Sequence, residues 1–134
     1  MKIHSEQEML AFGHDFAKSL HDKPTVIELI GDVGAGKTTF TRGLATGLGI
    51  KEPITSPSFT ISKAYAIPSG GRLVHYDFYR LSDPGLMTED LSENLRDPNN
   101  IIVIEWGESV TDLLPDNHIK LNISYNDDGT RSIE

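Results

Sequence analysis

A run of glycines around a lysine constrains the fold of this chain more than any other feature of its sequence. The segment Gly31–Thr38 reads GDVGAGKT, which matches the pattern G-x-x-x-x-G-K-[ST]. A β-branched, nearly continuous apolar run, Thr25–Ile30, precedes the segment, and an amphipathic stretch from Lys37 to about Leu48 follows it. This order predicts a buried parallel strand, then a phosphate-binding loop, then a helix.

The residue types of this loop suit a nucleoside triphosphate. Glycines let backbone N–H groups turn inward as an anion-binding nest, and the helix N-terminus adds the positive end of its dipole. Lys37 supplies a cation for the β- and γ-phosphates, and Thr38 supplies a hydroxyl ligand to magnesium. The flanking strand and helix disfavour the alternative, a glycine-rich turn with an exposed lysine. We therefore predict that the nucleotide contacts one continuous segment: Asp32, Val33, Gly34, Ala35, Gly36, Lys37, Thr38 and Thr39.

Two acidic residues follow apolar runs that are typical of strands. Glu105 comes directly after Ile101–Ile104, and Asp77 comes directly after Leu73–Tyr76. In an open α/β sheet the carboxyl ends of the strands face the crevice where ligands bind, so both acids are expected beside the phosphates. Carboxylates are needed there because magnesium must be held and a water molecule oriented. For each acid the alternative is a solvated or capping carboxylate.

The rest of the sequence predicts further helices and strands around this centre. Ser5 and Glu8 form a capping box that opens a helix to about His21, and Gly43 and Gly47 are expected to let the second helix pack closely on the sheet. We also predict a hairpin at 60–67 and 72–76, a loose helical insertion at 82–100, a helical turn at 110–114, and a half-buried strand at 119–125. These elements indicate one α/β domain over residues 1–134: a P-loop NTPase-like, mostly parallel sheet flanked by helices, with an antiparallel hairpin component.

Composition narrows the classes of function. The 134 residues are 37% hydrophobic and 24% charged, as in a globular protein, and the formal net charge is −8. An acidic surface without a stripe of lysine and arginine repels nucleic acid, so any role in an RNA pathway is expected to act through partners. The absence of cysteine excludes disulfides and thiolate chemistry. No apolar run suits a bilayer span or a signal peptide, which predicts a cytoplasmic protein without a membrane segment.

An ordered set of short motifs runs through the chain beyond the glycine-rich loop. They are Ser56–Thr60 (SPSFT), His75–Leu81 (HYDFYRL) and Ile104–Trp106 (IEW), and Thr41-Arg42-Gly43, Asp83-Pro84 and Leu114-Pro115 accompany them. With these motifs the sequence resembles the TsaE family, the small bacterial ATPases of tRNA threonylcarbamoyladenosine synthesis. The resemblance covers almost the whole chain. Ser58, Val33 and Gly107 depart from the residues usual in the family, and residues 85–100 match it poorly.

The resemblance implies a set of roles for residues of this chain. ATP and Mg²⁺ are the implied cofactors, with Thr38 and Glu105 as magnesium ligands and Asp77 assisting hydrolysis. Lys37, Asp77 and Glu105 are thus the expected catalytic residues, and the loop of Ser56–Thr60 corresponds to a switch-like segment near the γ-phosphate.

The resemblance also implies two nucleotide contacts outside the loop, Glu6 in the first helix and Arg131 near the C-terminus. From the residues alone, Glu6 is equally a charge that stabilises the helix dipole. Trp106 is most often a packing or interface aromatic, although it adjoins Glu105. His75 lies within a predicted strand without companions for a metal site, which favours a core or surface role.

The implied partners are TsaD, which carries out the transfer, and TsaB, so that tRNA is reached only indirectly. A small-molecule kinase using the same loop is the main alternative, but a kinase usually needs a basic lid, and residues 82–100 carry only Arg96 as a cation. A GTPase is disfavoured because an Asn-Lys-x-Asp motif is absent. A scaffold without turnover is disfavoured by the retained lysine and acids. No strong arginine-finger candidate is evident, which predicts slow hydrolysis by the chain alone.

Overall fold

The computed structural model describes residues 1–20, 25–32, 36–55, 57, 62–78, 85 and 87–134. Within these residues, seven strands form one sheet in the order β1-β7-β6-β2-β5-β4-β3. The strands are β1 (Lys2–Ile3), β2 (Thr25–Ile30), β3 (Ser62–Ala66), β4 (Arg72–Asp77), β5 (Ile101–Glu105), β6 (Ile119–Tyr125) and β7 (Arg131–Ile133). The helices are α1 (Glu6–Lys18), α2 (Lys37–Gly47), α3 (Met87–Arg96) and the 3₁₀ helix η1 (Gly107–Leu113).

The centre of the sheet is parallel and its two edges are antiparallel. Strand β2 pairs in parallel with β5 and β6, and β5 pairs in parallel with β4. The antiparallel pairs are β3 with β4 on one side, and β6 with β7 and β7 with β1 on the other. This confirms the predicted mixed α/β class with a mostly parallel sheet and a hairpin.

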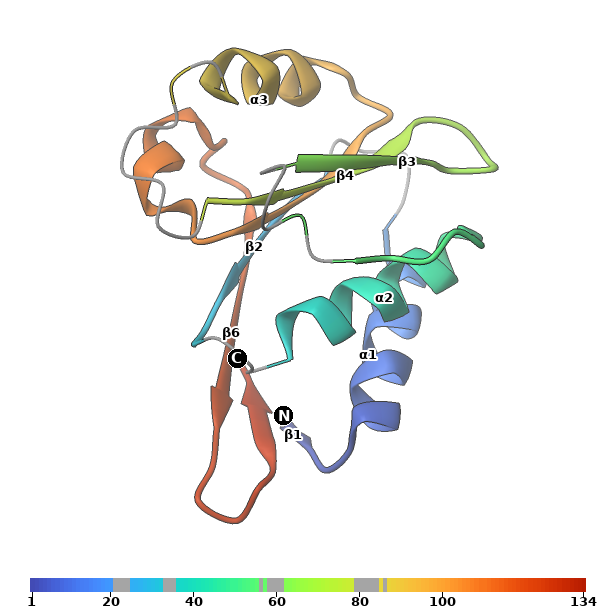
Figure 1. Ribbon diagram of the computed structural model, residues 1–134, viewed down its shortest axis with the longest axis vertical. Coiled ribbons are helices and arrows are strands. Elements are labelled where there is room, and N and C mark those ends of the chain that lie inside the picture. Colours follow the sequence, from blue (N-terminus) through green and yellow to red (C-terminus); the bar gives the residue numbers. More distant parts are fainter. Residues whose placement is uncertain (21–24, 33–35, 56, 58–61, 79–84, 86) are drawn as a thin grey trace.

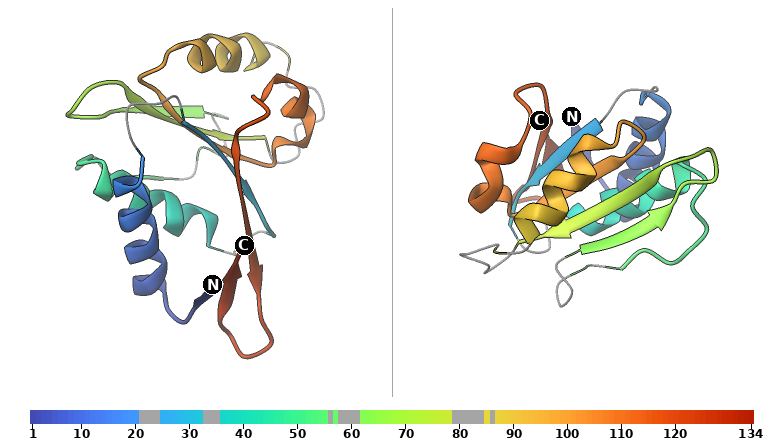
Figure 2. Two further views of the ribbon diagram at one scale, coloured as in Figure 1. Left: turned by 180° about the vertical axis from the view of Figure 1, so that it is seen from behind. Right: turned by 90° about the horizontal axis from the view of Figure 1, so that it is seen from above.

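Helices cover both faces of the sheet (Figures 1 and 2), and each face has its own core. Helices α1 and α2 pack on one face over residues such as Ile27, Leu29 and Val103. Helix α3 and η1 pack on the other over Val74 and Ile102, among others. Side chains alternate along a strand, so neighbours in register share a face. Glu105, which pairs in register with Leu29, therefore lies on the face under α2.

Helix α1 and helix α2 approach each other through glycines. A Cβ atom at Gly43 would lie 2.3 Å from the carbonyl oxygen of Leu10, and one at Gly13 would lie 2.4 Å from that of Phe40. A Cβ atom at Gly47 would lie 2.6 Å from the carbonyl oxygen of His14. The expectation that Gly43 and Gly47 serve close packing on the sheet is thus corrected, because these glycines face the backbone of α1.

Several predicted elements differ in extent or character from those observed. Helix α1 ends at Lys18 with Ser19 as its C-cap, short of the expected His21, which lies outside the described residues. The loose insertion contains a regular helix, α3, whose Leu91 is fully buried. Two short strands, β1 and β7, were not expected. No helix in the described part of the chain is long and apolar enough to cross a membrane.

Candidate active site at the carboxyl edge of the parallel sheet

The loop after β2 delivers Lys37 into the protein rather than to solvent. Gly36 is the N-cap of α2 with φ 112°, a left-handed conformation that favours glycine. The next residue, Lys37, is only 5% exposed. Its Nζ donates a hydrogen bond of 2.5 Å to the carbonyl oxygen of Gly31 and lies 4.1 Å from the centroid of the Trp106 ring. The ammonium group therefore lies between the carbonyl of Gly31, at the start of the glycine-rich loop, and the ring of Trp106.

The predicted loop contacts fall into two groups. Thr38 and Thr39 lie half-buried in the first turn of α2, whose N-terminus presents backbone N–H groups and a positive dipole end. Asp32 is exposed at the end of β2. Residues 33–35, which are Val33, Gly34 and Ala35, lie outside the described residues, so their predicted contacts stay predictions.

Four carboxylates act on the buried lysine through their negative charge. Burial lowers the pKa of Lys37 below its ordinary value, and the nearby charges of Glu105, Asp77, Asp32 and Glu108, in decreasing order, oppose this shift. The two acids predicted from strand ends are thus brought to the lysine predicted from the glycine motif. These negative charges favour the charged form of the ammonium, which a phosphate-binding cation requires.

Glu105 and Asp77 occupy equivalent places at the ends of neighbouring strands. They face each other in the β4–β5 register, and both are buried, at 4% and 8% exposure. Magnesium prefers oxygen ligands and usually combines one or two carboxylates with phosphate oxygens and water. Among the described residues no group of three His, Cys, Asp or Glu side chains could hold a metal. Thr38 and one of these carboxylates are the residues that could hold a magnesium ion bound together with a nucleotide.

His75 is a site neighbour that the sequence analysis placed in a core or surface role. It is fully buried on β4, two residues before Asp77 and therefore on the same face of the sheet. Its Nε2 donates a hydrogen bond of 2.5 Å to Oε2 of Glu105. The H-x-D spacing within a strand was the signal that could have placed His75 at the site, although it does not reveal the partner on β5.

Trp106 has an unusual backbone conformation at the end of β5. It is the single non-glycine residue with a positive φ in the described part of the chain, with φ 57° and ψ 49°. Such conformations cost about 1–3 kcal/mol and concentrate at functional sites. The turn starts η1 and lays the indole against the ammonium of Lys37. Trp106 thus belongs to the site, in addition to any packing role.

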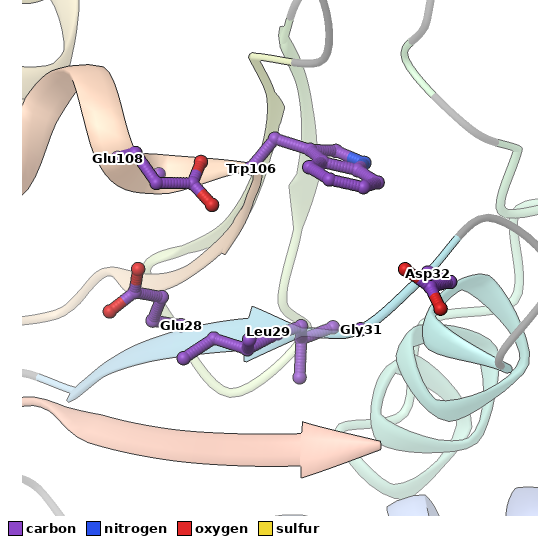
Figure 3. Close-up of a pocket in the computed structure, with 8 residues that line it drawn as sticks. Glu28, Leu29, Gly31, Asp32, Trp106 and Glu108 are labelled. Atoms are coloured by element: carbon purple, nitrogen blue, oxygen red, sulfur yellow. The ribbon is translucent and has the colours of Figure 1, made fainter. Parts of the chain in front are cut away.

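A small pocket adjoins the described part of the loop. It has a volume of about 160 Å³ and is lined by Glu28, Leu29, Ile30, Gly31, Asp32, Trp106, Gly107 and Glu108. Figure 3 shows the carboxylates of Glu28 and Glu108 on one side of this pocket and Trp106 and Asp32 nearer the start of the loop. Glu28 accepts a hydrogen bond of 3.0 Å from Nε2 of His118. This second histidine–carboxylate pair, which is partly buried, lies on the face of the sheet opposite to Glu105.

The two residues predicted to contact the nucleotide outside the loop lie at different places relative to it. A Cβ atom at Gly36 would lie 3.1 Å from Cε of Met9 and 3.4 Å from Cδ of Arg131. Arg131 also stacks on Tyr125, 4.4 Å from the ring centroid. The structure thus brings Arg131 of β7 against the loop. Glu6 is the exposed first residue of α1, and no described contact joins it to the loop.

Most of the switch-like segment predicted near the γ-phosphate is not among the described residues. Ser56, Ser58 and Thr60 of the switch-like segment lie outside the described residues. Their expected roles stay predictions.

Comparison with known proteins assigns the chain to a family. A family model described as "Threonylcarbamoyl adenosine biosynthesis protein TsaE" matches residues 3–133. The chain belongs to the TsaE family. The tRNA threonylcarbamoyladenosine biosynthesis protein TsaE of Haemophilus influenzae is 40% identical over 136 aligned residues, which covers 98% of this chain and 85% of the relative. That of Streptomyces coelicolor is 40% identical over 116 residues, covering 86% and 78%.

A solved structure extends the similarity to three dimensions. The crystal structure of YdiB from Bacillus subtilis superposes with a TM-score of 0.78 at 33% sequence identity, covering 99% of this chain and 80% of that one. The relatives named TsaE are tRNA threonylcarbamoyladenosine biosynthesis proteins by their titles. The family resemblance drawn from the motifs is therefore confirmed.

Proposed function

We propose that this TsaE-family chain binds and hydrolyses ATP with magnesium, and that hydrolysis serves tRNA threonylcarbamoyladenosine synthesis in a complex with TsaD and TsaB. One observation carries the ATPase part of the proposal. Lys37, the first residue of α2, is buried, and the charges that act on it come first from Glu105 and Asp77, at the ends of two neighbouring strands. A cation, a helix N-terminus and two strand-end acids are the parts that phosphoryl transfer requires.

Phosphate binding follows from the first turn of α2. The backbone N–H groups there have no partner within the helix, and they accept an anion in line with the dipole. The ammonium of Lys37 contacts the carbonyl of Gly31 and the ring of Trp106 at the start of the loop. Phosphate oxygens are stronger acceptors for an ammonium group than a neutral carbonyl is. Lys37 therefore exchanges the Gly31 carbonyl for the β- and γ-phosphates.

Hydrolysis needs two further roles. Thr38 and Glu105 would hold magnesium, which neutralises the charge that develops on the phosphate oxygens when it is bound. Asp77 lies opposite Glu105 across the β4–β5 pair, and its carboxylate is the second acid beside Lys37. It accepts a hydrogen bond from the attacking water and so orients that water toward the γ-phosphate.

Slow turnover by the chain alone is expected, since three of the described arginines contact residues other than Glu105. Arg42 donates to the carbonyl of Ile54, and Arg72 donates to Asn94 on α3. Arg131 lies beside Gly36, at the start of α2. We expect a partner to supply the cation that stabilises the charge at the γ-phosphate. TsaD and TsaB are the proposed partners, and they also supply the contact with tRNA that an acidic chain disfavours.

Helix α3 supports the ATPase over the kinase alternative. A kinase lid must move and usually carries cations toward the phosphates. Residues 87–96 instead form a helix fixed on the sheet: Leu91 is fully buried, and Asp90 and Asn94 are joined to the hydroxyl of Tyr76 by hydrogen bonds of 2.5 and 2.7 Å.

Phosphate release tests the proposal as a whole. The isolated chain should hydrolyse ATP slowly, TsaD and TsaB together should accelerate it, and Lys37→Ala and Glu105→Ala should abolish the accelerated rate. Fast turnover by the isolated chain would contradict the partner role. If Glu105→Ala retained normal turnover, the metal-ligand role would pass to Asp77.

A further inference from the structure

A histidine–carboxylate hydrogen bond lies directly behind the site acid Glu105. The Nε2 atom of His75 and the Oε2 atom of Glu105 are 2.5 Å apart, and the two side chains are 0% and 5% exposed. A carboxylate oxygen only accepts, so Nε2 carries the hydrogen and donates it. His75 comes from β4 and Glu105 from β5, thirty positions later in the sequence. The contact therefore exists only because the two strands are neighbours.

The surroundings of His75 indicate that the hydrogen bond to Glu105 is the reason for a histidine at this position. Its other ring nitrogen, Nδ1, is buried and has no hydrogen-bond partner among the described residues. In the register, His75 stands beside the apolar Val103, on the face that packs under α2. A leucine would fill this place without leaving a buried nitrogen unpaired, whereas the imidazole costs free energy there. The hydrogen bond to Glu105 offsets that cost.

We propose that His75 is a positioning residue for the magnesium site: it holds Oε2 of Glu105, so that only Oε1 serves as a metal ligand. The inference rests on the proposed function, because it assumes that Glu105 holds magnesium. A carboxylate with one oxygen fixed cannot rotate to bind the metal through both oxygens. Partners of this kind, which orient a metal ligand without touching the metal, commonly account for 10–100-fold of metal affinity.

Three variants of His75 separate positioning from packing. His75→Leu keeps the volume but removes the donor. His75→Gln places an amide N–H near the former Nε2, whereas His75→Asn is equally polar but ends near the former Nδ1. The control is His118→Leu, which breaks the other histidine–carboxylate pair, partly buried with Glu28 on the opposite face of the sheet.

The measurement is the affinity of Mn²⁺, as a probe for magnesium, for the full chain saturated with ATP, followed by electron paramagnetic resonance. ATP affinity in EDTA and thermal unfolding are measured beside it. His75→Leu and His75→Asn should weaken Mn²⁺ binding about 10–100-fold. His75→Gln should stay within about threefold of wild type, and ATP affinity in EDTA should change little in any variant. His118→Leu should leave Mn²⁺ affinity unchanged.

The outcomes distinguish this inference from the proposed function. If the wild-type chain bound no Mn²⁺ with ATP, the proposed function itself would fail. If the wild type bound Mn²⁺ and His75→Leu and His75→Asn bound it equally well, His75 would have no positioning role. A loss in His75→Gln as large as that in His75→Asn would also overturn the inference. If His75→Leu does not fold, the comparison of Mn²⁺ affinity between His75→Gln and His75→Asn alone tests the inference.

Discussion

Replacing Gly43 by alanine should separate helices α1 and α2. The added Cβ would lie 2.3 Å from the carbonyl oxygen of Leu10 and 2.9 Å from its carbonyl carbon, both backbone atoms. Leu10 must retreat by about 0.7 Å before the first contact reaches even 3.0 Å, the shortest that real Cβ atoms show. No side-chain rotation can relieve such a clash, so the helix itself has to move.

The expected cost is the difference between two effects. Overpacking of this kind costs about 3 kcal/mol, and alanine in place of glycine returns about 1 kcal/mol through helix propensity. The net loss is about 2 kcal/mol, which lowers the melting temperature by about 7 °C for a domain of this size. Urea unfolding followed by circular dichroism measures it. Because Met9 on α1 lies against Gly36, ATP affinity should fall as well.

Thr46→Ala is the matched control, since Thr46 is an exposed residue of the same helix. It should change stability by about 0.5 kcal/mol or less. A Gly43→Ala protein as stable as wild type, or more stable, would refute the account of the α1–α2 contact.

Three further predictions concern the loop and its lysine. Gly36→Ala, at φ 112°, should strain the start of α2 and weaken ATP binding at least tenfold, as calorimetry would show. Because burial lowers the pKa of Lys37, the unfolded chain binds this proton more tightly than the folded one. The free energy of unfolding should therefore rise with pH in the range just below 10.5, the ordinary lysine value, and Lys37→Met should lose this rise in urea titrations. Trp106, the single tryptophan, should change its fluorescence when MgATP displaces the ammonium from its ring, and unaltered emission at saturating MgATP would contradict that contact.

The parts of the fold that the sequence predicted are those with local signals. The capping box of Ser5 and Glu8 is observed, with the Ser5 hydroxyl accepting from the Glu8 N–H, because both groups lie within one turn. The run Thr25–Ile30 forms β2 because β-branched residues suit a buried strand. Asp77 and Glu105 are neighbours in register because parallel strands end at one edge.

The missed parts depend on contacts between distant residues. Gly43 carries no sign of whether a sheet or a helix faces it, and only the structure shows Leu10 there. His75 finds its acceptor thirty residues away, on another strand. Strands of two or three residues, such as Lys2–Ile3, are too short to show periodicity. Trp106 has a positive φ at the turn that starts η1, and no local residue pattern predicts this conformation.

Calorimetric titration of ATP into the isolated chain tests the central claim most directly. One ATP should bind per chain, more tightly with Mg²⁺ than in EDTA. Lys37→Ala should abolish binding, and Glu105→Ala should remove the advantage that Mg²⁺ confers. Binding that is insensitive to Mg²⁺, or that survives Lys37→Ala unchanged, would contradict the assignment of this edge of the sheet as an ATP–magnesium site.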